Sequence, residues 1–83
     1  MSELSVAVIS PEQIVYEGTA TQVVAPAYDG EVGILPGHAP LLTLLGEGVL
    51  RIGADVRVRV KGGFVQVASN VVRVVTEQAE RDA

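Results

Sequence analysis

The feature that most constrains the fold is an alternation of valine with basic residues between positions 56 and 61. Three valines alternate there with three cations, in the order Val56, Arg57, Val58, Arg59, Val60 and Lys61. Successive side chains of a β-strand point to opposite faces, so a period of two is typical of a strand with one buried and one solvated face. Such strands belong to antiparallel sheets. On an edge strand, this basic row would also act as a gatekeeper against unwanted pairing, and we favour that interpretation over a binding stripe because alternate charges on an exposed strand face are ordinary.

Short runs rich in β-branched residues recur along the rest of the chain, and no segment has a helical period. We expect strands at 4–9, 14–16, 19–25, 49–52, 56–61, 64–67 and 71–75, where 19–25 is either a third strand or the continuation of the second across a bulge. We expect Pro26 to end the third strand, and reversals at 29–30, 46–48, 53–55, 62–63 and 68–70. The pattern predicts one domain over residues 1–83, a small antiparallel β-sandwich or flattened barrel, with a polar tail from about residue 77 that is a fraying helical turn or disordered.

Composition narrows the possible partners. The chain has 83 residues with 6 Lys and Arg against 10 Asp and Glu, a net charge of −4. Nucleic acid is therefore not an expected partner, and neither is direct insertion into lipid. The longest apolar run, 34–45, is interrupted by prolines and a glycine, and the N-terminus lacks the pattern of a signal peptide. These features favour a soluble, cytoplasmic chain.

The residue types required for catalysis are scarce. His38 is the only imidazole and there is no cysteine, so neither a nucleophilic triad nor a transition-metal site is expected. No Gly-rich phosphate loop or dinucleotide fingerprint is present. The single lysine, Lys61, precedes the expected hairpin at Gly62-Gly63, which keeps a biotinyl or lipoyl carrier domain open as an alternative function. We expect a protein that is not an enzyme and has no cofactor.

The segment GILPGHAPLLT, residues 33–43, is apolar but cannot form a regular element throughout. Pro36 fixes its own φ and Gly37 can supply the positive φ of a type II turn, while Pro40 keeps the chain extended. The leucines that follow offer more aliphatic surface than a thin sandwich easily covers. A rigid loop beside surplus leucine favours a docking surface.

Three segments together resemble the epsilon subunit of bacterial F-type ATP synthases: GEVGILPGHAPLLT at 30–43, GVLRI at 48–52 and GGFVQV at 62–67. Their order and spacing match the family from the first strand to Glu80. The resemblance implies a β-sandwich of about ten short strands and a non-catalytic rotor subunit of the central stalk. It further implies that the chain binds the gamma subunit, touches the c-ring, and helps couple proton flow to ATP synthesis. Its expected location is peripheral, through the complex, on the cytoplasmic face of the cell inner membrane.

The resemblance also implies contact residues. Those expected at the c-ring are Glu31, Gly33 and Ile34, and those expected at gamma are Ser10, His38, Leu42 and Thr43. Two of these assignments have an alternative, because Glu31 can be a solvated turn residue and Leu42 can belong to the core. Family members usually continue into a two-helix domain that inhibits ATP hydrolysis and in some members binds ATP. No residues here match that domain, so these activities are not expected of this sequence.

Overall fold

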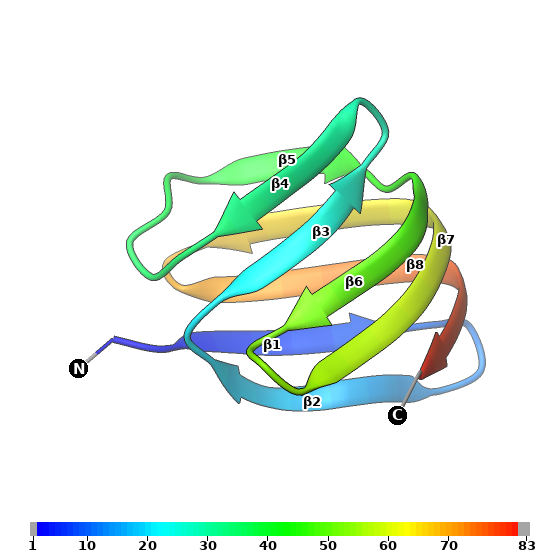
Figure 1. Ribbon diagram of the computed structural model, residues 1–83, viewed down its shortest axis with the longest axis horizontal. Helices are drawn as coiled ribbons and strands as arrows, with labels where there is room; N and C mark the ends of the chain where they lie inside the picture. Colours follow the sequence, from blue (N-terminus) through cyan, green and yellow to red (C-terminus); the bar gives the residue numbers. More distant parts are fainter. Residues whose placement is uncertain (1, 82–83) are drawn as a thin grey trace.

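The computed structural model describes residues 2–81, and within that range it contains eight β-strands and no helix (Figure 1). The strands are β1 (Leu4–Ile9), β2 (Ile14–Ala20), β3 (Val23–Ala27), β4 (Gly30–Ile34), β5 (Leu41–Leu44), β6 (Glu47–Ile52), β7 (Val56–Ala68) and β8 (Val71–Arg81). The all-β class is confirmed. The strands number eight rather than about ten, because two of them are long enough to serve in both halves of the sandwich.

A single sheet folds over on itself to make the sandwich. The strand order is β2-β1-β8-β7-β6-β3-β4, with β5 also paired to β7, and the sheet is open because β2 and β4 lie at its ends. The first part of β7 pairs with β6 and the second part with β5. We call the half formed by β5, the end of β7, the start of β8, β1 and β2 the β1 layer. The other half, formed by β4, β3, β6, the start of β7 and the end of β8, is the β3 layer (Figure 1).

The two layers meet at a corner built on Gly62 and Gly63. The expected reversal at this pair is wrong, because β7 runs through it as one bent strand. Both glycines have positive φ, +74° and +105°, a region that residues with a Cβ rarely adopt. Gly63 lies opposite Thr76 of β8, and a Cβ on it would lie only 1.9 Å from the carbonyl oxygen of Val75. The glycine pair therefore allows two adjacent strands to bend in close contact.

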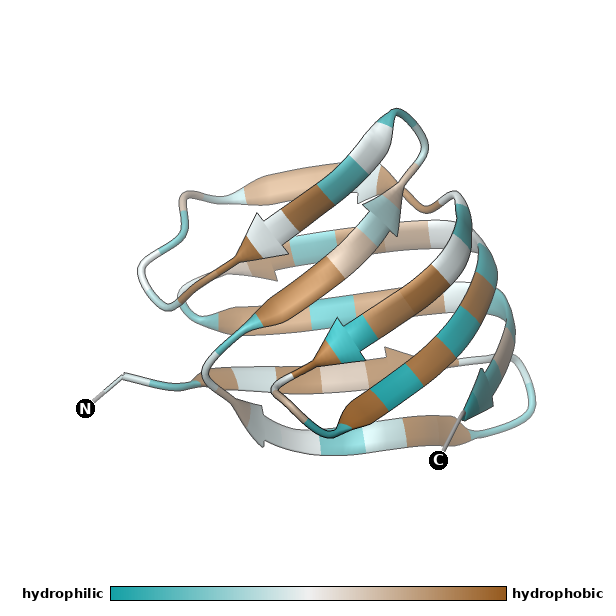
Figure 2. Cartoon of the chain, in the orientation of Figure 1, coloured by the Kyte–Doolittle hydropathy of each residue, from teal (hydrophilic) through white to brown (hydrophobic). Residues whose placement is uncertain are grey.

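The space between the layers is filled by aliphatic side chains. The fully or nearly fully buried hydrophobic residues are Leu4, Val6, Val8, Val23, Ala25, Ile34, Leu45, Leu50, Ile52, Val58, Val60, Val65, Val67, Val72 and Val74. Along the first part of β7 the valines face inward and the cations outward, which confirms the predicted alternation (Figure 2). Because β7 lies between β6 and β8, however, it is not an edge strand, and the gatekeeper interpretation is wrong. No helix of the described residues is long and apolar enough to cross a membrane.

Three local expectations also need correction. Residues 77–81 are mostly polar but continue β8 as a strand paired with β7. Ala79 packs against the core, and Arg81 lies 5.5 Å from the centroid of the Tyr16 ring. Residues 82–83 of the expected tail lie outside the described residues.

Pro26 does not end the third strand but lies inside β3. The ladder between β3 and β6 covers only Val23 and Val24, so the missing N–H of Pro26 removes no hydrogen bond from that ladder. Residues 47–48 begin β6 rather than forming a turn.

Candidate functional site

An apolar row, exposed at Leu44, Phe64 and Ile14 and half-buried at Val75 and Ile9, crosses the outer face of the β1 layer. The cross-strand partners that form it are, in order, Leu44, Phe64, Val75, Ile9 and Ile14, one from each of five strands. We call these residues the apolar row. Leu44 is 61% exposed and Ile14 58%, although side chains of this size are usually buried. A contiguous apolar strip of this kind on the surface of a small domain is typical of an interaction site.

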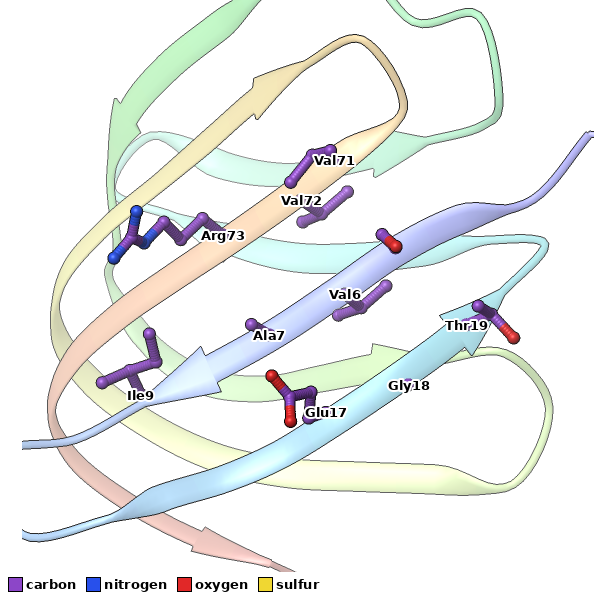
Figure 3. Close-up of a pocket in the computed structure, with 10 residues that line it drawn as sticks. Val6, Ala7, Ile9, Glu17, Gly18, Thr19, Val71, Val72 and Arg73 are labelled. Atoms are coloured by element: carbon purple, nitrogen blue, oxygen red, sulfur yellow. The ribbon is translucent and has the colours of Figure 1, made fainter.

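Two hollows border the apolar row. One of about 440 Å³ lies at the row itself, lined by Ile9, Phe64 and Val75 together with Ser10 and Thr76 among others. A second hollow of about 460 Å³ lies over β2, β1 and β8, where Glu17 and Arg73 stand on opposite sides of Ala7 (Figure 3). The outer face of the β1 layer therefore has two hollows that partner side chains could occupy beside the apolar row, and one of them is lined by the charged residues Glu17 and Arg73.

The loop between β4 and β5 is tied by a hydrogen bond to the same layer. The expected type II turn is present, since Gly37 has φ +87° and the His38 N–H donates to the Leu35 carbonyl at 3.0 Å. The Gly37 N–H donates to Asn70 Oδ1 at 2.8 Å, which ties the loop to the turn between β7 and β8. The His38 ring nitrogen Nδ1 lies 2.6 Å from the carbonyl oxygen of Ala39, so the ring is also engaged locally.

Replacing Asn70 by glycine is expected to release this loop without disturbing the β7–β8 turn. Asn70 has φ +62°, which glycine adopts at no steric cost, so only the side-chain acceptor is lost. One hydrogen bond at this site should be worth about 0.5–1.5 kcal/mol. Amide hydrogen exchange at Gly37 should become faster in Asn70→Gly, while exchange in the β7–β8 ladder stays unchanged. Unchanged exchange at Gly37 would show that the bond does not hold the loop.

The residues expected at gamma are only partly brought together. Ser10 is buried beside the 440 Å³ hollow, and its hydroxyl donates to the Gln13 carbonyl at 3.2 Å. Leu42 is 69% exposed on the outer face of the β1 layer, so it is not a core residue. Thr43 is half-buried and pairs with the buried Val65, which places it on the inner side of β5. His38 is half-buried in the loop.

The residues expected at the c-ring lie on β4, in the opposite layer. Glu31 is exposed and its Oε1 lies 3.4 Å from Nη2 of Arg51. Gly33 is exposed on the same side of β4, whereas Ile34 is 0% exposed in the core, so its side chain is not available to a partner. The two sets of expected contacts therefore lie on different faces of the sandwich.

Sequence reasoning missed most of the apolar row. Its members alternate with buried residues, so runs such as VVRVV at 71–75 carry apolar side chains on both faces of the strand. Apolar residues on both faces of a strand are the sequence signal from which an apolar outer face could have been predicted. Among residues 2–81, no group of three or more His, Cys, Asp or Glu side chains is placed to hold a metal ion.

Comparison with known proteins agrees with the fold and shows the family. Residues 3–82 match the family described as "ATP synthase, Delta/Epsilon chain, beta-sandwich domain". Relatives named ATP synthase epsilon chain include one from Synechococcus elongatus, 47% identical over 81 residues, and one from Leptospira borgpetersenii, 45% identical over 78 residues. These matches cover 94% and 90% of this chain but only 59% and 61% of the relatives, so the chain spans about three fifths of their length.

Solved structures share the fold at low sequence identity. A chain of the Euglena gracilis mitochondrial ATP synthase, in a structure of OSCP, F1 and the c-ring, superposes with a TM-score of 0.88 at 20% identity, covering 98% of this chain and 54% of the other. A chain from the central stalk and c-ring of the Tetrahymena thermophila enzyme gives a TM-score of 0.75 at 18% identity, covering 93% and 65%. Together with the match over residues 3–82, the sandwich shows that the chain belongs to the family of ATP synthase delta/epsilon chain β-sandwich domains.

Proposed function

We propose that the chain is a non-catalytic rotor subunit in the central stalk of an F-type ATP synthase. In this role it docks the gamma subunit to the c-ring and helps couple proton-driven rotation to ATP synthesis. It is held peripherally, through the complex, at the cytoplasmic face of the cell inner membrane. Support comes from the relatives named ATP synthase epsilon chain, and from the central-stalk and c-ring assemblies that contain its structural neighbours.

The observation that carries the proposal is the apolar row. A non-catalytic docking subunit needs an exposed apolar surface, and five strands of the β1 layer present one. Ser10 and Leu42 lie at or beside it, and we propose them as gamma contacts together with Leu44 and Phe64. Glu31 and Gly33 face outward on the opposite layer, and we propose them as c-ring contacts. Two separate faces suit a subunit that links two partners.

The carrier-domain alternative loses its structural basis. It required Lys61 at the tip of a hairpin, but Lys61 lies within β7, between Glu47 of β6 and Gln78 of β8. The intact mass of the protein, after co-expression with a biotin or lipoate ligase, is expected to show no adduct. An adduct on Lys61 would favour the carrier function.

The direct test is co-purification of the chain with purified gamma and c-ring. We expect a stable complex with gamma at micromolar concentration, which corresponds to about 8 kcal/mol of binding free energy. The complex of the chain with gamma should in turn bind the c-ring. Binding to neither partner at that concentration would contradict the proposal.

Substituting Glu31 is expected to weaken the c-ring contact modestly. An exposed ion pair contributes about 0–1 kcal/mol, so Glu31→Ala should reduce c-ring affinity by at most about fivefold. Glu31→Lys should reduce it further, because it places a cation where a carboxylate stood. Glu17→Lys makes the same charge change on the β1 layer and serves as the control for binding to the c-ring. Equal c-ring affinity of Glu31→Lys and the unmodified chain would show that Glu31 is only a solvated turn residue.

A further inference from the structure

Three arginines gather over one hollow on the outer face of the β3 layer. Arg51 of β6 is the direct cross-strand partner of Arg57 of β7, and Arg59 lies two residues further along β7. Together with Glu31 and Val49, these arginines line a hollow of about 340 Å³. Half of the six basic residues of an acidic chain therefore lie at one place.

This arrangement is unfavourable for the isolated fold. Like charges directly opposite each other on neighbouring strands destabilise a sheet. The only ion pair formed here among the described residues joins Arg51 to Glu31 at 3.4 Å, with the two side chains 49% and 59% exposed, so it offsets little of the repulsion. The cations are also not needed to protect an edge, because β7 is central in the sheet. Glu80 of β8 is the cross-strand partner of Arg59 but forms no ion pair with it, so Arg57 and Arg59 remain without an ion-pair partner among the described residues.

The side chains that line the hollow determine which class of ligand it can bind. Guanidinium groups bind the oxygens of phosphates through paired, charge-assisted hydrogen bonds. Protein partners and membranes usually require an exposed apolar or aromatic anchor as well. The large exposed hydrophobic residues of the described chain, namely Ile14, Tyr28, Leu35, Leu42, Leu44, Phe64 and Val71, do not line this hollow. A small soluble anion fits such a surface better than a macromolecule.

We propose that Arg51, Arg57 and Arg59 form a binding site for a small phosphate compound carrying two or more negative charges. Glu31 acts as an internal competitor, because its carboxylate holds Arg51 until the ligand displaces it. The site is separate from the apolar row and does not depend on gamma or the c-ring. Its three arginines are not among the proposed contacts with gamma or the c-ring, whereas Glu31, which lines the hollow, is also proposed at the c-ring.

The test is a titration of the 83-residue chain with inorganic pyrophosphate at low ionic strength, followed by backbone amide NMR shifts. We expect saturable shifts confined to β4, β6 and the start of β7. Arg57→Gln should weaken pyrophosphate binding by about fivefold or more, and Glu31→Gln should strengthen it by about fivefold. Arg73→Gln removes the same charge from the β1 layer and should leave the affinity unchanged.

Folding and charge effects are separated within the same experiment. Arg57→Gln relieves the repulsion from Arg51, so its melting temperature should not fall, and weaker binding then reflects loss of the site. The proposal is overturned if Arg57→Gln and Arg73→Gln weaken binding equally, since the effect would be one of net charge. It is also overturned if shifts do not saturate by about 10 mM pyrophosphate, or if the chain binds vesicles rich in anionic phospholipid but not free pyrophosphate.

Discussion

Gly63→Ala is expected to lower the free energy of unfolding by about 2–6 kcal/mol, a large part of the stability of the domain. The added Cβ would lie 1.9 Å from the Val75 carbonyl oxygen and 2.7 Å from the Thr76 Cα, both backbone atoms of a paired strand. Overpacking costs about 1–3 kcal/mol and a strained φ about 1–3 kcal/mol more. A domain of this size has only about 4–12 kcal/mol of stability. Urea denaturation followed by circular dichroism measures the loss.

Gly33→Ala is the matched control for this substitution. Gly33 also lies in a strand, but nothing lies within 4 Å of the position its Cβ would occupy, and its φ is not positive. Its free energy of unfolding should stay within about 0.5 kcal/mol of the parent value. Equal stability of Gly63→Ala and Gly33→Ala would show that the bend of β7 tolerates a side chain.

Leu44→Asp is expected to abolish tight binding to gamma while leaving the domain folded. Leu44 is 61% exposed at one end of the apolar row, so the substitution removes no core contact. Burying a leucine at an interface contributes about 1.5–3 kcal/mol, and affinity for gamma should fall by about 10- to 100-fold. Isothermal titration calorimetry with purified gamma measures this change, and the melting temperature reports the fold.

Ala54→Asp adds the same charge at an exposed position in the turn between β6 and β7. Its affinity for gamma should equal that of the unmodified chain, which excludes a general effect of negative charge. If Leu44→Asp binds gamma normally, the apolar row is not the docking surface. If Leu44→Asp unfolds, the residue contributes to the core in spite of its exposure.

Local patterns predicted the parts of the fold that depend on neighbours in sequence. The Val-Arg alternation located the buried and solvated sides of the first part of β7, and Asp29-Gly30 and Ser69-Asn70 marked hairpin turns, the latter pair with φ +52° and +62°. Gly62-Gly63 could not be interpreted in this way. Two glycines permit a reversal and a bend equally well, and the choice depends on β8 crossing at Thr76.

In the candidate site, too, some features follow from neighbours in sequence and others depend on the pairing of distant strands. The turn at Pro36-Gly37 followed from local chemistry and is present. The apolar row did not follow, because it takes one residue from each of five strands and depends on β1 running parallel to β8. Ile34 was expected at the c-ring from the motif, but a motif does not say which side of a strand a residue faces. Glu31 and Gly33 of β4 are exposed, whereas Ile34 is buried in the core.

The bend of β7 and β8 has a mechanical consequence. In a sandwich of two separate sheets, the layers are joined by side-chain packing and loops, and they can slide past each other under shear. Here two neighbouring strands pass from one layer into the other while remaining paired, except at Gly62, from Val58–Arg81 to Ala68–Val71. A load applied to the outer face of one layer is therefore carried to the other along covalent backbone and its ladder. The continuous strands therefore keep the two faces of the sandwich in a fixed relation.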